Sequence, residues 1–419
     1  MMRRVIFCLI SFLAKDGRAA ESAASGKDNV EIIIDAGSTG SRMYVFHTGA
    51  DGTLVHSKMV GKKKPGLSSF AETPGGALVP LQSLFSKFLA EEGPRFGGST
   101  IDVKIFGTAG MRLLSDEKRS SVWRAVGDGL NSYFVRRDDL QAEHDITFKL
   151  LKTETIAGET EGLFALMGVN YLVQQTKTGA QPCERYGMLD LGGSSTQIAI
   201  PSDCNHITSG NSFVRSFPES GMELTRALVN RMFTPTQRRS CYFTGYETSS
   251  GGADARPCYD LVREAMQSEP GSPYYSSEDF RKLSTSKLSF VAVSGYTYVT
   301  SFASWLLAKH APELAFVASY PAPMLSAIKE AATQICALPW SEVEKELGHE
   351  FTGRSKLPHR CFEMNYIWTL LHVYMSGCDD CKNINFTEEI NGSEVEWPIG
   401  AWLYFSKQRT MSQHQKEEL

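Results

Sequence analysis

The chain lacks a long apolar run that could cross a membrane. Its one prominent apolar stretch, Val5–Ala14, has only about half of the ~20 residues that a spanning helix needs. Arg3 and Arg4 precede this stretch and the small residues Ala19–Ala20 follow it. This order is typical of a signal peptide, so we expect residues 1–20 to be removed and to leave no stable membrane anchor.

The sequence also lacks a basic pattern for nucleic-acid binding. Its 43 Lys and Arg against 47 Asp and Glu give a net charge of −4, and no basic stripe is interleaved with aromatic residues. We therefore expect no nucleic-acid partner, and we interpret Lys62–Lys64 as a solvated turn. With 419 residues, 42% of them hydrophobic, the chain is long enough for two domains with separate cores.

Cysteines occur in an even number once the signal peptide is removed. Cys8 leaves with it, so eight of the nine cysteines remain, which favours a disulfide framework. The Cys-x-x-Cys motif has no second pair of ligands for zinc, so we interpret it as a local disulfide. The expected pairs are Cys183–Cys204, Cys241–Cys258, Cys336–Cys361 and Cys378–Cys381.

Two further features concern the cellular compartment. Asn385 and Asn391 begin glycosylation sequons, which are used in the secretory pathway. The chain ends in Lys416–Leu419, KEEL, one conservative change from the KDEL retrieval address. We expect the endoplasmic reticulum lumen, and secretion is the alternative if KEEL is only a charged tail.

The chain is organised around a hairpin, Glu31–Phe46, with the sequence EIIIDAGSTGSRMYVF. The β-branched run Ile32–Ile34 predicts a buried strand, and Met43–Phe46 predicts the strand that returns. Between them, a loop of glycines and hydroxyls can cradle a phosphate, and Asp35 can hold the metal that accompanies it.

The same plan occurs again at Tyr186–Ile200, YGMLDLGGSSTQIAI. A strand ends at Asp190, glycines and hydroxyls follow, and a second strand returns. One such hairpin would more often be purely structural. Two of them predict related lobes that face a shared phosphate-binding cleft.

Two other segments could contribute to this cleft. Gly107–Arg112 joins a strand to a helix and could bind an anion, although for this segment alone an ordinary strand–helix connection is the favoured interpretation. Ala157–Gly162 leads into an apolar helix, Leu163–Val173, so Glu161 lies at the N-terminus of that helix. Glu161 could favour the helix dipole or act as a general base on water.

Five blocks in this order resemble the apyrase conserved regions of the nucleoside triphosphate diphosphohydrolases. They are DAGSTGSR (Asp35–Arg42), GTAGMRLL (Gly107–Leu114), AGETEG (Ala157–Gly162), LDLGGSSTQ (Leu189–Gln197) and EWPIGAW (Glu396–Trp402). The resemblance implies an α/β, actin-like (ribonuclease-H-like) fold with two lobes, duplicated mixed sheets and a central nucleotide cleft. We expect lobe I at 28–160, lobe II at 161–396, a return to lobe I at 397–411 and a tail at 412–419.

The resemblance also implies roles for single residues. Glu161 matches the catalytic base, and Gln197 would help to place the attacking water. A Mg²⁺ or Ca²⁺ ion would be held, largely through waters, by Asp35, Thr108 and Asp190. The phosphates would be bound by Ser38, Thr39, Gly40, Gly193, Ser194 and Ser195, with Ser194 standing where the family usually has alanine.

The nucleobase site is the least defined by the sequence. Ile384–Gly392 resembles the loop where the family stacks an aromatic residue on the base, which nominates Phe386. Phe386 lies inside a sequon, however, where a glycan would interfere. Tyr296 and Tyr298 are the other candidates, and each could equally be a packing residue.

The short chain without membrane anchors is similar to the soluble lumenal nucleoside diphosphatase branch of this family. The resemblance implies metal-dependent hydrolysis of the terminal phosphate of nucleoside diphosphates, with UDP and GDP favoured, by in-line attack of water. One alternative is a secreted apyrase that acts on ATP and ADP. A sugar kinase of the same fold is disfavoured by the secretory signal and by Glu161. Another alternative is an inactive lumenal binding protein, against which Asp35, Glu161 and Asp190 argue. We expect a monomer.

Overall fold

The computed structural model describes residues 29–49, 51–136, 142–175, 185–203, 206–246 and 256–417, with side chains to residue 408. The expected signal peptide and the cysteines Cys183 and Cys204 lie outside these residues. The other three expected disulfides are present, as Cys241–Cys258, Cys336–Cys361 and Cys378–Cys381.

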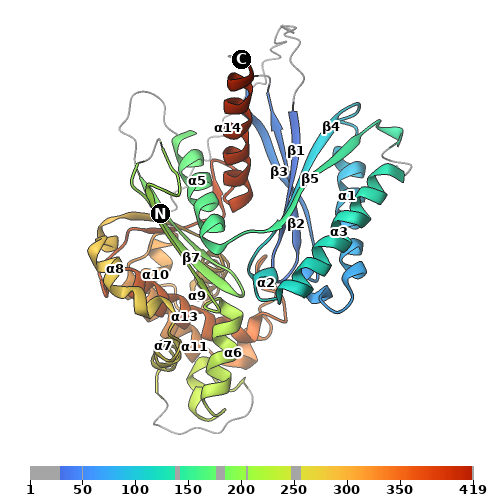
Figure 1. Cartoon of the computed structure of the whole chain (residues 1–419). Helices are drawn as coiled ribbons and strands as arrows, with labels where there is room; N and C mark the ends of the chain where they lie inside the picture. The colour runs from blue at the N-terminus through green and yellow to red at the C-terminus, as the bar shows by residue number, and fades with distance from the viewer. Residues whose placement is uncertain are drawn as a thin grey trace, which may run out of the picture.

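Two five-stranded sheets form the two lobes (Figure 1). The first has the order β3 (Leu54–Lys63), β2 (Ser41–Thr48), β1 (Asn29–Ala36), β4 (Thr100–Gly107) and β5 (Thr147–Thr155). The second has the order β8 (Ser212–Pro218), β7 (Ser195–Pro201), β6 (Tyr186–Leu191), β9 (Ser289–Ser294) and β10 (Ile384–Phe386).

The two sheets have the same internal plan. In each one a hairpin pairs antiparallel with a third strand on one side, β1–β2–β3 and β6–β7–β8. On the other side, the first hairpin strand pairs parallel with a later strand, and that strand pairs with another, β1–β4–β5 and β6–β9–β10. The duplicated α/β lobes expected from the repeated hairpin are confirmed.

Most of the described helices each pack into the separate hydrophobic core of one lobe. In lobe I these are α1 (Leu78–Glu92), α2 (Ala109–Arg112) and α3 (Asp116–Arg136). In lobe II they are α6 (Met222–Met232), α7 (Cys258–Ser268), α8 (Ser277–Lys282), α9 (Gly295–His310), α10 (Ala315–Ser319), α11 (Leu325–Ala337), α12 (Trp340–Val343) and α13 (Arg360–Tyr374). The 3-10 turns are η1 (Leu67–Phe70), η2 (Pro74–Ala77), η3 (Gln237–Cys241), η5 (Pro273–Ser276), η6 (Thr285–Lys287) and η7 (Leu357–His359).

Two further helices, α5 (Gly158–Gln175) and α14 (Trp397–Glu417), lie side by side between the sheets (Figure 1). They share one hydrophobic core with the inner faces of both sheets. Close approach requires glycine, because a Cβ at Gly168 would lie 2.6 Å from Ile399 Cγ2 and one at Gly400 only 1.7 Å from Phe164 O. The apolar C-terminal stretch thus packs on β1 and β2 of lobe I and also on α5. Helix α14 continues to Glu417, through most of the segment expected to be a tail.

Helices on both sides explain the sequence of the central strands. Ile32, Ile33 and Ile34 are fully buried although their side chains alternate between the two faces of the sheet. A strand covered on both faces is apolar throughout, whereas a half-exposed strand alternates. A small hairpin, β11 (Glu389–Ile390) and β12 (Ser393–Glu394), then connects β10 to α14.

Candidate active site

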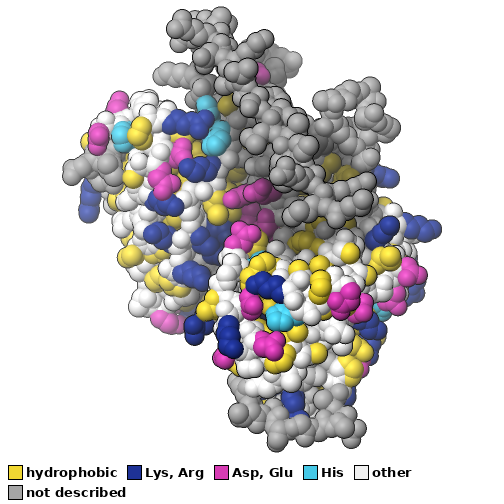
Figure 2. Space-filling view, turned by 180° about the vertical axis from the view of Figure 1, so that it is seen from behind, with side chains coloured by type: hydrophobic (Ala, Val, Ile, Leu, Met, Phe, Trp, Pro, Cys, Tyr) yellow, Lys and Arg dark blue, Asp and Glu magenta, His cyan; other side chains and the backbone are white. Residues whose placement is uncertain are grey.

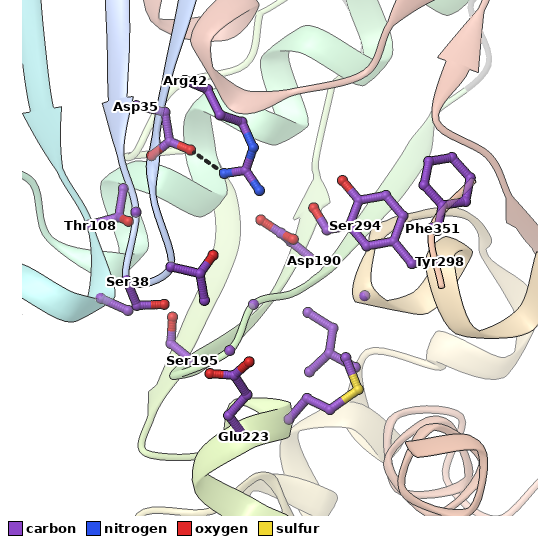
Figure 3. Close-up of a pocket in the computed structure, with 18 of the residues that line it drawn as sticks. Asp35, Ser38, Arg42, Thr108, Asp190, Ser195, Glu223, Ser294, Tyr298 and Phe351 are labelled. Carbon is purple, nitrogen blue, oxygen red and sulfur yellow. Dashed lines mark hydrogen bonds and ion pairs between the residues drawn. The ribbon is translucent and has the colours of Figure 1, made fainter. Parts of the chain in front are cut away.

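The turns of the two repeated hairpins face each other across a cleft of about 540 Å³ between the lobes (Figure 3). The distance between the turns is short, since a Cβ placed on Gly193 would lie 3.4 Å from Ser38 Oγ. Residues 37–39 from lobe I and 191–193 from lobe II line the cleft. The sequence prediction of two loops around one site is therefore matched by the geometry.

The three residues expected to hold a metal all line this cleft. Asp35 lies near the end of β1 and Asp190 near the end of β6, while Thr108 directly follows β4. The parallel pairing of β1 with β4 brings Thr108 beside Asp35, and its amide donates a hydrogen bond to Ala36 O at 3.2 Å. Figure 3 shows the three side chains on the two sides of the cleft.

Asp35 presents an acceptor that the protein does not satisfy. Its Oδ2 accepts a hydrogen bond from Arg42 Nη1 at 2.9 Å. Its Oδ1 is buried and has no partner at hydrogen-bonding geometry in the described part of the chain. Burial raises the pKa of Asp35, and the charge of Arg42 opposes the rise. A buried acceptor without a partner costs free energy, so this oxygen is suited to a ligand.

The carboxylates fit a cation that keeps part of its water shell. Among the described residues, no three His, Cys, Asp or Glu side chains are grouped closely enough to chelate a metal directly. Mg²⁺ in particular retains several waters and is often held by one or two carboxylates together with substrate phosphates. Asp35, Asp190 and Thr108 offer such oxygen ligands. Burial, with a smaller effect of the Glu161 charge, raises the pKa of Asp190 to about 7.

Glu161 lies in the first turn of α5, as predicted, and its carboxylate is buried beside the cleft. Arg112 of lobe I donates to Glu161 Oε2 at 2.9 Å from Nη1 and to Ser195 Oγ at 3.1 Å from Nη2. Burial raises the pKa of Glu161 to about 7, against the lowering effect of Arg112. A carboxylate with a pKa near the operating pH is suited to general-base catalysis.

Gln197 is held in place next to the second phosphate turn. Its Nε2 donates to Ser195 Oγ at 3.0 Å and to Ser216 Oγ at 3.1 Å. The side chain is buried and lines the cleft close to Glu161. With both donors in use, the amide oxygen is the group that could accept a hydrogen bond from a water.

The phosphate-binding candidates divide into two groups. Ser38, Thr39, Gly193 and Ser195 line the cleft. The other two candidates, Gly40 and Ser194, do not belong to its lining. Gly40 packs against the backbone of β3 instead, since a Cβ there would lie 2.7 Å from Lys63 O.

Of the base-binding candidates, only Tyr298 lines the cleft. Tyr296 is fully buried in the lobe II core. Phe386 belongs to the same core and stacks on Tyr320 with ring centroids 6.5 Å apart. The structure adds Phe351, whose ring centroid lies 4.7 Å from that of Tyr298 on the lobe II wall (Figure 3).

The sequence reasoning did not assign several charged residues of the cleft. Lys62, expected to be in a solvated turn, lies in β3 and lines the cleft, and burial lowers its pKa to about 8. On the opposite side, Lys356 Nζ donates to Glu223 Oε1 at 2.5 Å. Arg112, which contacts Glu161 from outside the cleft lining, lies within the second block, Gly107–Leu114, so its place in that motif was the signal that could have identified it.

A comparison with protein-family models matches residues 22–224 and 251–418 to the GDA1/CD39 (nucleoside phosphatase) family. The chain belongs to this family. It is 26% identical to the nucleoside-diphosphatase mig-23 of Caenorhabditis elegans, over 89% of this chain and 76% of that protein. It is 25% identical to the probable apyrase 2 of rice, Oryza sativa subsp. japonica, over 94% of this chain and 90% of that protein.

The fold has relatives among solved structures. The nucleoside triphosphate hydrolase of Neospora caninum superposes with a TM-score of 0.52 at 14% identity, covering 90% of this chain and 92% of that one. The two-lobed actin-like fold expected from the sequence is confirmed. The family match and the similarity to a nucleoside-diphosphatase and an apyrase make the protein a hydrolase that acts on nucleotide phosphates.

The surface charge and the apolar character of the helices bear on nucleic-acid binding and on membrane crossing. On the face shown in Figure 2, Lys and Arg side chains are interspersed with Asp and Glu, without a continuous basic surface over the described residues. In the same part of the chain, no helix combines the length and the apolar character that crossing a membrane requires.

Proposed function

We propose that the protein removes the terminal phosphate of nucleoside diphosphates, with UDP and GDP favoured, by in-line attack of a water molecule. Glu161 acts as the general base in this scheme. The observation that carries the proposal is the position of Glu161, since its buried carboxylate lines the same cleft as both phosphate turns. In-line displacement needs the attacking water and the phosphoryl group held on one line.

The phosphate chain would lie between the two turns. Backbone and hydroxyl groups at Ser38, Thr39, Gly193 and Ser195 would bind its oxygens, and Gln197 would orient the water. Charge develops on the phosphoryl oxygens during transfer, and donors fixed in advance stabilise that charge without reorganisation. The fixed hydrogen bonds of Gln197 and Arg112 around Ser195 support such a rigid arrangement.

A divalent cation, Mg²⁺ or Ca²⁺, would be held by Asp35, Thr108 and Asp190, mostly through waters. When bound, it would neutralise phosphate charge and polarise the terminal phosphoryl group. The unsatisfied Oδ1 of Asp35 supports a cation at this place. Chelation should therefore abolish the reaction.

The nucleobase would lie against the aromatic pair formed by Tyr298 and Phe351. The backbone at Phe351 is held by Arg360, which donates from Nη2 to Phe351 O at 2.6 Å and from Nε to Thr352 Oγ1 at 2.9 Å. A planar stacking surface accepts different bases, so this wall is compatible with both uracil and guanine. For the compartment, we propose lumenal retention through KEEL.

The test is phosphate release by the chain from Glu21 onward, with disulfides intact, from UDP, GDP, ADP, ATP and UTP. Each substrate is assayed with Mg²⁺, Ca²⁺ or a chelator. Removing a general base costs about 10²- to 10⁴-fold in rate, so Glu161→Gln should lose activity to this extent. The matched control is Glu159→Gln, an exposed carboxylate in the same helical turn, which should remain active.

The outcomes separate the candidate functions. Cation-dependent release that favours UDP or GDP and is lost in Glu161→Gln supports the proposal. Equal release from ATP and ADP would favour a general apyrase. An active Glu161→Gln enzyme would overturn the assignment of the base.

A further inference from the structure

The residue that joins β9 to α9, Ser294, has an unusual backbone conformation. Its φ is 57° and its ψ is −126°, a region that L-residues with a side chain rarely occupy. Such a residue persists only where its surroundings hold it, and such residues cluster at functional sites. Ser294 lines the cleft, at the register position beside Leu191, so it is next to the second phosphate turn.

The Glu388 side chain is hydrogen-bonded to the backbone at this junction. Its Oε1 accepts a hydrogen bond from the Ser294 amide at 2.8 Å. The backbone around Glu388 is itself fixed, because its carbonyl accepts from Val395 N at 2.8 Å and the amide of Thr387 donates to Ala292 O at 3.2 Å. These backbone hydrogen bonds to β9 and to Val395 fix the position from which the Glu388 side chain extends.

The other side of Ser294 faces Asp190. Figure 3 shows the Ser294 and Asp190 side chains adjacent in the cleft, and burial raises the pKa of Asp190 while the Ser294 side chain lowers it. The Glu388 carboxyl is thus bonded to the Ser294 amide, and the Ser294 side chain lies next to Asp190. Asp190 is one of the carboxylates that the proposed reaction requires.

We propose that Glu388 is a positioning residue, which holds Ser294 in its left-handed conformation so that the Ser294 hydroxyl orients Asp190. This inference rests on the proposed function, in which Asp190 contacts the cation waters and the phosphate. Glu388 does not touch the substrate in this arrangement. It acts through the backbone of one residue.

A hydrogen-bond acceptor, and not a negative charge, is what this role requires. Burial, reinforced by the neighbouring Glu396, raises the pKa of Glu388 to about 9, which favours the protonated carboxyl group at neutral pH. Gln has the same shape as a protonated Glu and keeps an oxygen that can accept from the Ser294 amide. Ala removes the acceptor and leaves the amide unpaired.

Glu388 also lies near Tyr298, which belongs to the proposed base wall, since each side chain shifts the pKa of the other. The two possible routes of action differ in their kinetic signature. A role through Asp190 changes the transition state and therefore kcat, whereas a role through Tyr298 changes nucleotide binding and therefore KM.

The experiment compares Glu388→Ala, Glu388→Gln and Ser294→Ala in the full mature chain, with Glu389→Ala as the control. Glu389 is the neighbouring carboxylate and is exposed. Because small misplacements of catalytic groups can cost up to 100-fold, Glu388→Ala should lower kcat for UDP about 10- to 100-fold with little change in KM. Glu388→Gln should keep most of kcat, and Glu389→Ala should match the wild type.

A double-mutant cycle tests the route. If Glu388 acts through Ser294, the Glu388→Ala change should have little further effect in the Ser294→Ala background. Titration calorimetry with Mg²⁺ or Ca²⁺ alone gives a second readout, in which Glu388→Ala and Ser294→Ala should weaken cation binding alike. Circular dichroism checks that each variant is folded.

Several results would overturn the inference. They are an unchanged kcat in Glu388→Ala, an effect on KM alone, additive losses in the cycle, or a Glu388→Gln enzyme as impaired as Glu388→Ala. The Gln variant decides the question if Glu388→Ala does not fold. Failure of the inference alone would leave an active wild type, whereas a wild type without nucleotide hydrolysis would overturn the proposed function as well.

Discussion

Arg112 of lobe I donates a hydrogen bond to Glu161 of α5, the helix between the two sheets, with 2.9 Å between Nη1 and Oε2. The arginine is supplied by the short helix after β4, and the glutamate by the first turn of α5. This pair joins lobe I to α5 at the point where the proposed base acts. It also sets two opposing effects on the carboxylate, since burial favours its neutral form and the guanidinium favours its charged form.

The first prediction concerns the pH dependence of the reaction. A general base must be deprotonated, so kcat/KM should rise with pH and level off above about 7, the pKa of Glu161 raised by burial and opposed by Arg112. Arg112→Gln removes the opposing charge. The acidic limb of the pH–rate profile should therefore move to higher pH by about 1 unit or more.

The control for this profile is Arg119→Gln, which removes a surface arginine that pairs with Asp116. Its acidic limb should coincide with that of the wild type. An Arg112→Gln profile with an unshifted limb would show that Glu161 is not the group that titrates.

The second prediction concerns the aromatic wall. Phe351→Ala removes one ring of the pair with Tyr298. Since stacking contributes about 1–3 kcal/mol per base, KM for UDP should rise about tenfold or more. Hydrolysis of ribose 5-diphosphate, which lacks a base, should not change.

Phe386→Leu provides the contrast, because Phe386 lies in the core. That variant should have a lower Tm and an unchanged KM for UDP. The opposite pattern, with KM affected at Phe386 and not at Phe351, would return the base site to the loop that the sequence first suggested.

The third prediction concerns stability. Burial raises the pKa of Glu396 from 4.5 to about 7, with Arg42 opposing the rise. The folded state therefore binds the proton more tightly than the unfolded state, and the free energy of unfolding falls as pH increases from about 4.5 to 7. Gln stays neutral, so Glu396→Gln should remove this loss, which is of the order of 3 kcal/mol at most.

Thermal unfolding at pH 5 and pH 8 measures this effect. The Tm difference between Glu396→Gln and the wild type should be larger at pH 8 by a few degrees. Glu389→Gln, in the exposed hairpin before α14, is the control. A difference that is equal at both pH values would contradict the prediction.

The fourth prediction uses two glycines in helices. Gly400→Ala would place a Cβ 1.7 Å from Phe164 O, so α14 and α5 would have to separate and the Tm should fall by several degrees. Gly127 in α3 has no atom within 4 Å of the corresponding position. Gly127→Ala should therefore be neutral or stabilise the protein by about 0.5–1 kcal/mol, because Ala favours helix. A fall in Tm at Gly127 as large as that at Gly400 would contradict the argument.

Much of the cleft could be predicted because its signals are local. A β-branched run, an acidic residue and a turn of glycines and hydroxyls define each hairpin, and the pairing of Asp35 with Arg42 follows directly from the turn. The helix at Glu161 was also predicted, although it begins at Gly158, earlier than its apolar pattern suggests.

The base wall could not be predicted in the same way. Phe351 lies in a segment without periodicity, and its position depends on a hydrogen bond from Arg360, nine residues later. For Phe386, aromatic character alone did not distinguish core from cleft. The alternation of β10 does, because Phe386 shares its buried face with Ile384 while Asn385 points outward, so a glycan on Asn385 would lie on the opposite face of the strand from Phe386.

The position of α14 between the sheets has a consequence for synthesis of the protein. The ribosome completes both sheets before it reaches Trp397, and until then the apolar side of α5 that α14 covers has no partner. The nascent chain must therefore keep this surface from aggregating until its last segment emerges. Premature termination between Phe386 and Trp397 would release a chain with both sheets complete and the apolar side of α5 uncovered, which is a substrate for chaperones and quality-control proteases.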